Sequence, residues 1–536
     1  MERQEGGKIK KFFFKLRNTV VPVFVYGGAV GAVVGVIVTF FNMGAEWLTA
    51  NSSKIYDWFY SNPYYIPLLF LCLAAFALIM ALVHSRVPEV RGSGVPQTEG
   101  VMRGFFSFRK LKVFLATIFL SFISFFCGLP LGSEGPSIQV GATTAAGTAH
   151  ALKTRLAWRR YLISAGAGAG LAVAFNAPLT GLVFVLEEGQ RKFTATMLFT
   201  CSAAIVSATL VYRALRNAIF GAWENHVLFD LSGISLDYTD FNIYWMLLIL
   251  GVIVGVCAIL FNVLLIRTQR VTDKWGKKFP YWARLLVTFL IVGAVGLIPA
   301  VKGAIFGGST LIKDLYAQAD MAWYIIMAVL IVKFLLILLC YNSGATGGLF
   351  VPMLALGALI GALAGKAFIA AGMSETYYPV MVCVGMTAFF AASVRTPITA
   401  AVLIVEITGY SLDFLPAIVA IFAAYVAAEL SGNRPIYDSM LDRYLRNNGL
   451  DRKRKLHRLE IDVEEGSFIV GRYPVDIMWE HGCRIRGIYR GEELVLPDDG
   501  ETRIKGGDVL VLEIMTDDLD ASFRYLYGLV TNFSVL

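Results

Sequence analysis

Residues 132–142 read GSEGPSIQVGA, and residues 348–358 read GLFVPMLALGA. Both stretches place a proline four residues after the first glycine and a Gly-Ala pair five residues after that proline. A second pair, residues 178–187 and 397–406, follows in the same order, each beginning Pro-x-Thr and ending in Glu. The members of the two pairs lie 216 and 219 residues apart. Single matches mean little where Gly and Ala are common, but two ordered matches at nearly one offset predict two homologous halves.

Long apolar segments surround these stretches. Hydrophobic residues make up 57% of the 536 residues and charged residues only 16%, whereas about a quarter of a soluble domain is charged. Runs of roughly 20 apolar residues are typical of membrane-spanning helices. The composition therefore predicts an all-α polytopic membrane protein and excludes a disordered chain. The clearest apolar runs are 20–41, 65–83, 112–130, 195–212, 243–266, 284–301, 322–340, 349–371 and 412–430.

Other apolar runs are short or interrupted by Gly and Pro. They are 160–175, 177–187, 379–394 and 397–408. Broken backbone at membrane depth is tolerated only where it is buried in protein or lines a polar cavity. Inverted repeats with interrupted helices are common in transporters, whose substrates bind where the halves meet. We therefore expect two inverted-topology repeats, about 20–215 and 240–430, with broken or re-entrant helices.

Positive charge gathers at both ends of the apolar region. Six Lys or Arg residues lie within 1–19, and seven lie from Arg443 to Arg458. Basic residues beside spans mark the cytoplasmic side, so we expect both termini in the cytoplasm and an even number of crossings. This placement also argues against nucleic acid as a partner, although it leaves contact with anionic lipid open.

Composition changes after residue 445. We interpret 446–458 as a basic linker and 459–536 as a small α+β cytoplasmic domain, near the lower size limit for independent stability. Alternating runs predict strands at Leu459–Val463, Ser467–Val470, Arg484–Tyr489, Glu493–Leu496 and Asp508–Ile514, with a closing helix at Asp517–Tyr527.

Glu134 stands at the expected start of a helix. Free N–H groups and the helix dipole make such a terminus an anion site. A carboxylate at membrane depth costs about 2.5–3.5 kcal/mol unless it is paired or neutralised. Glu134 either caps the helix in a loop, or occupies the anion position and leaves when protonated; the motif alone leaves both readings open.

Three further segments offer anion-binding groups. The amides of Leu349 and Phe350, after two glycines, could point at an anion, or simply begin a helix. Ser93 lies between Gly92 and Gly94 and could donate its hydroxyl, or belong to a plain turn. In the third segment, the hydroxyl of Tyr437 could donate to an anion, or the side chain could anchor the protein at the membrane interface.

Taken together, these motifs resemble those of the CLC family of chloride channels and chloride/proton antiporters. The family's signatures appear in order as GSGVP at 92–96, GSEGP at 132–136, GGLFVP at 347–352 and the Tyr437 segment. The resemblance covers about 20–445. It implies a helical membrane domain of two inverted halves, a homodimer with an anion pathway in each subunit, and a location in the bacterial plasma (inner) membrane.

The resemblance also implies roles for single residues. The hydroxyls of Ser93 and Tyr437 and the amides of Leu349 and Phe350 would bind the central anion, and Glu134 would be the external gating glutamate. Chloride would be bound as substrate, with no metal or cofactor. The supporting filter backbone would comprise Gly92, Gly94, Gly132, Gly135, Gly347 and Gly348.

Glu188 separates the two branches of the family. In many antiporters an acid at this position relays protons from the cytoplasm, whereas the channels usually have an apolar residue. Glu188 therefore favours antiport. The alternative is a solvated helix end at which the acidic side chains of Glu187 and Glu188 form ion pairs with Arg191. Glu187 has a repeat mate in Glu406, which suggests a structural role for it, but Glu188 has none because Ile407 takes its place.

Substrate choice follows from the same motifs. Ser93 resembles the chloride-type filter, whereas a proline there is associated with nitrate. Fluoride-exporting relatives usually depart at Ser93, Pro136 and Tyr437, and this chain keeps all three. Chloride is therefore expected. One departure is Ser133, where many relatives carry Arg or Lys, and we expect it to alter pH dependence or transport rate.

The tail resembles the C-terminal subdomain of potassium-conductance regulators, called RCK-C or TrkA-C. The resemblance rests on residues 471–475, 488–492, 496–497 and 505–508, mostly turns formed by glycines and Asp508. Such domains dimerise, and some bind small ligands, including cyclic di-AMP. The tail is thus either a regulatory module that takes a nucleotide or a passive dimer clamp.

The sequence therefore predicts a secondary transporter exchanging chloride for protons, gated by Glu134 and supplied with protons through Glu188. The alternative is a passive voltage- or pH-gated chloride channel, and a third reading is a ligand sensor dominated by its tail. An enzyme is not expected, because the chain lacks a phosphate-binding loop, a serine hydrolase elbow and metal-ligand spacing among its five histidines.

Overall fold

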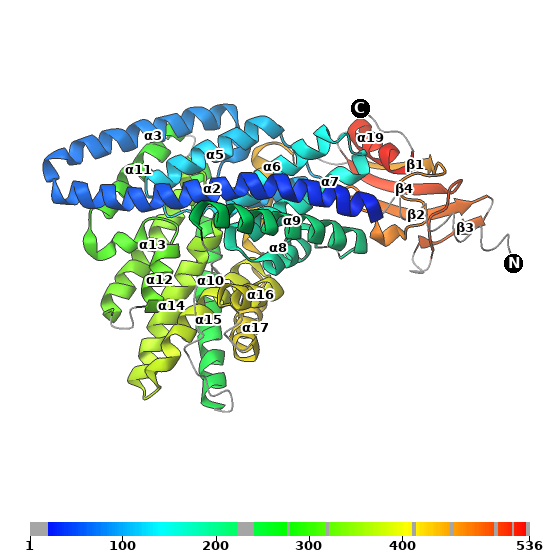
Figure 1. Ribbon diagram of the computed structural model, residues 1–536. Helices are drawn as coiled ribbons and strands as arrows, with labels where there is room; N and C mark the ends of the chain where they lie inside the picture. Colours follow the sequence, from blue (N-terminus) through cyan, green and yellow to red (C-terminus); the bar gives the residue numbers. More distant parts are fainter. Residues whose placement is uncertain are drawn as a thin grey trace.

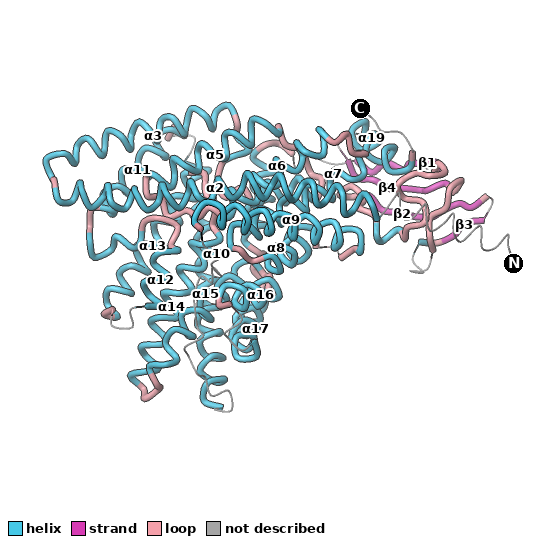
Figure 2. Tube along the Cα trace, in the orientation of Figure 1, coloured by secondary structure: helices cyan, strands magenta, loops and turns pink. Residues whose placement is uncertain are grey.

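The computed structural model shows a large helical part with a small sheet domain at one end (Figure 1). Coloured by secondary structure, the strands are confined to that end, where α19 (Leu519–Val530) lies beside them (Figure 2). The predicted N-terminal segment, 1–19, lies outside the described residues. The structure describes residues 20–191, 193–221, 241–275, 279–317, 321–409, 414–450, 455–491, 493–497, 502–516 and 519–531.

The first half of the membrane part contains eight helices among the described residues. The helices are α2 (Val21–Ser61), α3 (Ile66–Arg86), α4 (Val95–Met102), α5 (Lys110–Phe126), α6 (Glu134–Ala151), α7 (Leu156–Phe175), α8 (Pro178–Phe184) and α9 (Ala195–Phe220). A π-helical turn, Val185–Gln190, directly follows the short helix α8.

The second half repeats the packing of the first. α6 packs against α7 as α14 packs against α15, and α2 packs against α9 as α10 packs against α17. The predicted two-repeat helical fold is thereby visible in the pairing. The helices are α10 (Phe241–Trp275), α11 (Tyr281–Gly296), α12 (Ser309–Ala317), α13 (Trp323–Ser343), α14 (Phe350–Ala370), α15 (Tyr378–Val394), α16 (Pro397–Ile407), α17 (Phe414–Leu430) and α18 (Ile436–Asn447).

Small residues bring these helix pairs close together. A Cβ atom at Gly31 of α2 would lie 2.0 Å from the carbonyl oxygen of Ala204 on α9. In the other half, a Cβ at Gly251 of α10 would lie 2.4 Å from the carbonyl oxygen of Ala420 on α17. Close approach of backbones through Gly and Ala is how helices gain packing energy in a membrane.

The helices divide by length. Seven helical stretches among the described residues are long and apolar enough to cross a membrane, judged by length and composition. Three other apolar helices are shorter, namely α11, α16 and α17. α8 and α4 are shorter still, with 7 and 8 residues. α8 and α16 are the short helices expected from the interrupted runs 177–187 and 397–408. The other two interrupted runs, 160–175 and 379–394, instead belong to the longer helices α7 and α15, so the expectation of short segments is wrong for them.

The C-terminal domain is a four-stranded antiparallel sheet in the order β1-β4-β2-β3. Arg490 and Asp508 join two of its strands' ends. Arg490 donates from Nε and Nη2 to the Asp508 carboxylate, each at 2.9 Å, and these hydrogen bonds raise the pKa of the Arg490 guanidinium. The strands are β1 (Lys455–Asp462), β2 (Cys483–Arg490), β3 (Glu493–Val495) and β4 (Val509–Thr516).

Two expectations for the tail are wrong in detail. β1 begins at Lys455, inside the segment 446–458 that its basic composition assigned to the linker. β1 is an edge strand, and charged residues are characteristic of edges. The predicted strand Ser467–Val470 is a series of turns instead. Its apolar residue Phe468 packs against an aromatic ring of the membrane part, so its apolar character reflects docking.

The sheet domain docks on α7. Phe468 packs edge-on to Trp158, with ring centroids 5.2 Å apart. The hydroxyl of Tyr161 donates to the carbonyl of Asp476 at 3.0 Å and accepts from the amide of Met478 at 3.1 Å. Arg472 donates to the hydroxyl of a threonine on α9 at 2.6 Å. The tail is therefore held to the membrane part by buried polar contacts as well as by aromatic packing.

Candidate anion and proton site

Three helices begin at one point in the interior. The backbone groups of Gly132 and Gly348 exchange two hydrogen bonds, of 2.8 and 2.7 Å, just before α6 and α14 begin. The amide of Gly347 donates to the carbonyl of Gly92 at 3.0 Å, which holds the loop before α4 against them. Helix N-termini carry partial positive charge. The fold thus gathers three such termini around one position.

Glycine is required at this meeting point. A Cβ at Gly135 would lie 2.3 Å from the carbonyl oxygen of Ser93, and one at Gly348 would lie 2.7 Å from the amide nitrogen of Gly135. Gly92 and Gly94 have φ angles of +83° and +80°, a conformation that residues with a Cβ rarely adopt. Close backbone approach therefore explains Gly135 and Gly348, and the positive φ angles explain Gly92 and Gly94.

Ser93 and Tyr437 bring hydroxyls to this region. Both side chains are buried, and neither hydroxyl has a hydrogen-bond partner among the described residues. Tyr437 lies in the first turn of α18, which packs against α4. An interface anchor would be exposed, so that alternative is wrong for Tyr437. Two unpaired buried donors fit an anion.

Leu349 and Phe350 lie where expected. Leu349 is the residue before α14 and Phe350 is its first residue, and both are fully buried. Amides in the first turn of a helix lack intrahelical acceptors. The structure thus brings these two amides to the same meeting point as the Ser93 loop, directly after the Gly132–Gly348 bridge in the chain.

Glu134 is the first residue of α6, and its side chain is only 6% exposed. Its carboxylate lies beside Gly132 and beside Val351, in the first turn of α14, and its Oε2 has no hydrogen-bond partner among the described residues. The hydroxyl of Ser133 donates to Glu134 Oε1 at 3.3 Å. A carboxylate of α6 therefore lies at the N-terminus of α14, where an exogenous anion would also be stabilised.

A cavity of about 270 Å³ leads to Ser93. Arg91 and Arg284 lie in its lining, with their guanidinium carbons 4.4 and 5.3 Å from the ring centroid of Tyr281. Tyr341 lines the same cavity and donates to the carbonyl of Gly347 at 2.9 Å. Sequence reasoning missed these residues. A polar cavity with cationic groups is suited to guide an anion toward the Ser93 loop.

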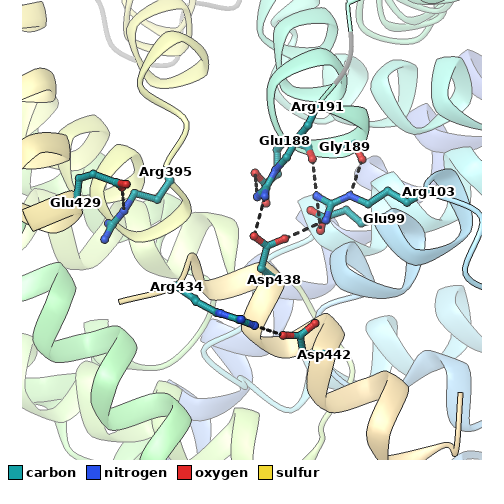
Figure 3. A network of polar contacts seen from close by, with 10 residues as sticks. All are labelled: Glu99, Arg103, Glu188, Gly189, Arg191, Arg395, Glu429, Arg434, Asp438 and Asp442. Atoms are coloured by element: carbon teal, nitrogen blue, oxygen red, sulfur yellow. Dashed lines mark hydrogen bonds and ion pairs between the residues drawn. The ribbon is translucent and has the colours of Figure 1, made fainter. Parts of the chain in front are cut away.

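Glu188 lies in the π-helical turn after α8 and is 1% exposed. Its Oε2 accepts from Arg191 at 3.0 Å, and Arg191 also pairs with Asp438 at 2.8 Å. Figure 3 shows Asp438 between Arg191 and Arg103. The ion pair between Arg103 Nη1 and Asp438 Oδ1 has a distance of 2.9 Å. The solvated helix end is therefore wrong for Glu188, because the side chain is buried within an ion-pair network.

Glu99 completes this network and was not singled out from the sequence. It lies on α4, and one oxygen each of Glu99, Glu188 and Asp438 all lie within 4.8 Å of one another. A signal was present, since Glu99 is the only charged residue in 92–102, a stretch that carries the Ser93 loop. Arg103 and Asp438 gave no such signal, because charged residues are common in polar segments like theirs.

Glu187 and Glu406 play a different part. The Glu187 carboxylate accepts from the amides of Ile398 and Thr399 at the start of α16, at 3.1 and 2.7 Å. Glu406 accepts from the corresponding amides at the start of α8, at 2.9 and 2.7 Å. Each repeat thus caps a helix of the other, and the structural role expected of Glu187 is confirmed.

Comparisons with known proteins match most of the chain to two families. Residues 73–429 match the family described as voltage gated chloride channel, and residues 459–527 match the TrkA-C domain. An H(+)/Cl(−) exchange transporter ClcA of Yersinia pseudotuberculosis is 30% identical over 457 residues, covering 82% of this chain and 91% of the relative. A ClcA of Citrobacter koseri is 30% identical over 465 residues, covering 85% and 96%.

Solved structures agree. A slow cyanobacterial Cl−/H+ antiporter is 29% identical, with a TM-score of 0.72, over 80% of this chain and 99% of that one. A CLC-type fluoride/proton antiporter, 20% identical with a TM-score of 0.66 over 78% and 98%, shares the fold. These relatives are transporters rather than enzymes. The chain therefore belongs to the voltage-gated chloride channel (CLC) family and carries a TrkA-C domain behind its membrane domain.

Proposed function

We propose that this protein exchanges chloride for protons across the membrane. The observation that carries the proposal is the position of Glu134, whose buried carboxylate lies beside Val351 at the start of α14. One position can then hold either the carboxylate or chloride. Protonation removes the charge of Glu134 and releases it from the helix terminus, so that chloride takes its place.

Chloride binds beside this position in the proposed cycle. Ser93 and Tyr437 donate their unpaired hydroxyls, while Leu349 and Phe350 donate their amides. The cavity lined by Arg91 and Arg284 supplies the anion from the side of the Ser93 loop. Direct hydrogen bonds from neutral groups hold chloride without neutralising it, which keeps the ion exchangeable.

Protons reach Glu134 from Glu188 in this account. Glu188 is buried in a network shared with α4 and α18, the helices that carry the Ser93 loop and Tyr437. A passive chloride channel would have no use for a buried acid at this position. The name H(+)/Cl(−) exchange transporter, borne by the bacterial relatives, supports antiport over the channel and chloride as the anion.

The protein is proposed to act as a homodimer in the inner membrane, with both termini cytoplasmic. The first turns of α2 lie at the same end of the molecule as the C-terminal sheet (Figure 1). Tyr26 of α2 contacts Trp158, with ring centroids 6.3 Å apart, and Trp158 contacts Phe468 of the tail. This shared end supports placing both termini on one side.

Ligand control through the tail is proposed as well. Arg160 donates to the carbonyl of Trp479 in the tail at 3.2 Å and to the carbonyl of Met102 at 3.3 Å. Met102 ends α4 and also accepts from Gln190 at 2.8 Å, two residues after Glu188. Movement of the tail would thus reach the proton network. Titration of the full-length protein with cyclic di-AMP tests this; absence of binding heat removes that ligand.

Glu188→Gln tests the antiport itself. In liposomes, we expect this variant to keep chloride flux while proton flux falls at least tenfold, because glutamine keeps the shape but cannot carry a proton. Glu375→Gln, on a short turn outside the network, is the control and should leave both fluxes unchanged. Equal loss of both fluxes in Glu188→Gln would assign this residue to folding or anion conduction instead.

A further inference from the structure

Glu99 is the least satisfied member of the acidic network. Its side chain is fully buried, and neither carboxylate oxygen has a hydrogen-bond partner among the described residues. The nearest cation is Arg103, with Nη2 3.6 Å from Glu99 Oε2. Arg103 donates instead to the carboxylate of Asp438 at 2.9 Å and to the carbonyl of Glu188 at 2.8 Å.

The charges in this network do not balance when every group ionises. Glu99, Glu188 and Asp438 supply three negative charges, whereas Arg103 and Arg191 supply two positive charges. Asp438 is paired with both arginines and Glu188 with one (Figure 3). An unpaired buried carboxylate is strongly disfavoured. One proton bound within the network would remove the excess negative charge. Glu99 is the acid whose two carboxylate oxygens accept no hydrogen bond among the described residues.

Glu99 and Asp438 both lie near the anion site along the chain. Glu99 lies on α4, six residues after Ser93, and Asp438 follows Tyr437 directly on α18. The groups facing Glu99 are Arg103 on its own helix, and Glu188, Arg191 and Asp438 on the adjoining elements. α4, which follows the Ser93 loop, thus carries Glu99, and α18 carries both Tyr437 and Asp438.

We propose that Glu99 is a proton-holding residue that shares one proton with Glu188. The inference rests on the proposed antiport. The proton leaves the carboxylic acid of Glu188, which becomes a carboxylate paired with Arg191, and binds a carboxylate oxygen of Glu99. The return transfer reverses these changes. Glu99 therefore stores the proton next to the anion site while Glu188 is free to take another.

Three variants test the assignment in liposomes. Glu99→Gln keeps the size of the side chain but cannot exchange a proton, so we expect proton flux to fall at least tenfold while chloride flux changes by less than about threefold. Glu99→Asp should recover part of the proton flux. Asp442→Asn is the matched control, because Asp442 lies one turn beyond Asp438 on α18 and pairs outside the network with Arg434 (Figure 3).

An infrared difference spectrum between acid and alkaline pH gives a second readout that a structural role would not move. The full-length protein should show the C=O band of a protonated carboxyl, and Glu99→Gln should lose it. An unchanged band, or wild-type proton-to-chloride coupling in Glu99→Gln, overturns the proposal and leaves antiport intact. If the wild type moves no protons, the proposed antiport fails, and loss of the band in Glu99→Gln then decides proton holding alone.

Discussion

Glu134 has a position compatible with both of the roles that its sequence motif left open. It begins α6, as a helix-capping acid would, yet its carboxylate lies at the start of α14. The fold achieves this by joining the two repeat segments through the Gly132–Gly348 bridge. A residue of one repeat can therefore act as the anion of the other.

Ser133 contacts Glu134, to which its hydroxyl donates a hydrogen bond of 3.3 Å. Introducing a cation by Ser133→Arg should favour the ionised carboxylate, so that stronger acid is needed to release it. We expect the pH of half-maximal chloride flux to fall by about one unit. Ser133→Gln adds similar bulk without charge and should leave the midpoint in place. Equal shifts in the two variants would show that size, not charge, matters here.

Tyr437 is expected to contribute one hydrogen bond to bound chloride. Tyr437→Phe removes that donor and should weaken chloride binding about tenfold, the effect of losing a hydrogen bond to a charged group. Isothermal titration of the purified protein with chloride measures the change. Tyr378→Phe, which removes another buried hydroxyl without a partner among the described residues, is the control. Unaltered affinity in Tyr437→Phe would remove this hydroxyl from the site.

At the scale of elements, the two repeats hold each other in place. Glu187 and Glu406 each accept two amides at the start of a helix from the opposite repeat. The π-helical turn then separates Glu187 from Glu188 in function, because it follows α8 and turns Glu188 into the buried network. Such π-helical turns are frequent at functional sites.

Removing a capping charge should cost stability without uncoupling transport. Glu406→Gln is expected to destabilise the protein by about 1–2 kcal/mol, since a carboxylate cap and its dipole interaction are lost. Glu187→Gln should cost a similar amount, because its contacts mirror those of Glu406. Thermal unfolding in detergent measures the first effect and proton-to-chloride coupling the second. A loss of coupling in Glu187→Gln alone would place that residue in the proton path.

Apolar runs predicted the long membrane helices and two short ones, α8 and α16, but not α4 or α12. The tail was harder to read. Ser467–Val470 alternates like a strand, but Phe468 packs against Trp158 across the domain boundary. Local pattern cannot tell packing within a domain from docking between domains. The network around Glu99 was not predicted, because its five charged groups are far apart in the sequence. They come from α4 and its end, from the π-helical turn and its end, and from α18.

At the scale of the whole molecule, the tail and the transport site are physically connected. Tyr161 exchanges hydrogen bonds with the backbone of Asp476 and Met478, and Arg160 links the tail to the end of α4. The link from the tail to α4 therefore runs through Arg160 of α7. On the proposed function, we expect this link to carry a change in the tail to the network around Glu188.

Tyr161→Phe tests that connection. The change leaves two backbone groups without their partner, which should weaken docking by about 1–3 kcal/mol. We expect faster hydrogen exchange in residues 474–479 and an altered transport rate. Tyr473→Phe, which removes a hydroxyl bonded to Arg503 within the tail, should change neither. Faster exchange with an unaltered rate would make the contact a tether without influence on transport.

The central claim is that one molecule couples chloride to protons through Glu134 and Glu188. The most direct measurement uses the purified protein in liposomes with a chloride gradient, no proton gradient, and the voltage clamped by potassium and valinomycin at zero driving force for protons. The account predicts uphill proton movement, recorded as internal pH, that disappears in Glu134→Ala and Glu188→Ala. Chloride flux without proton movement in the wild type would contradict the account and make the protein a passive channel.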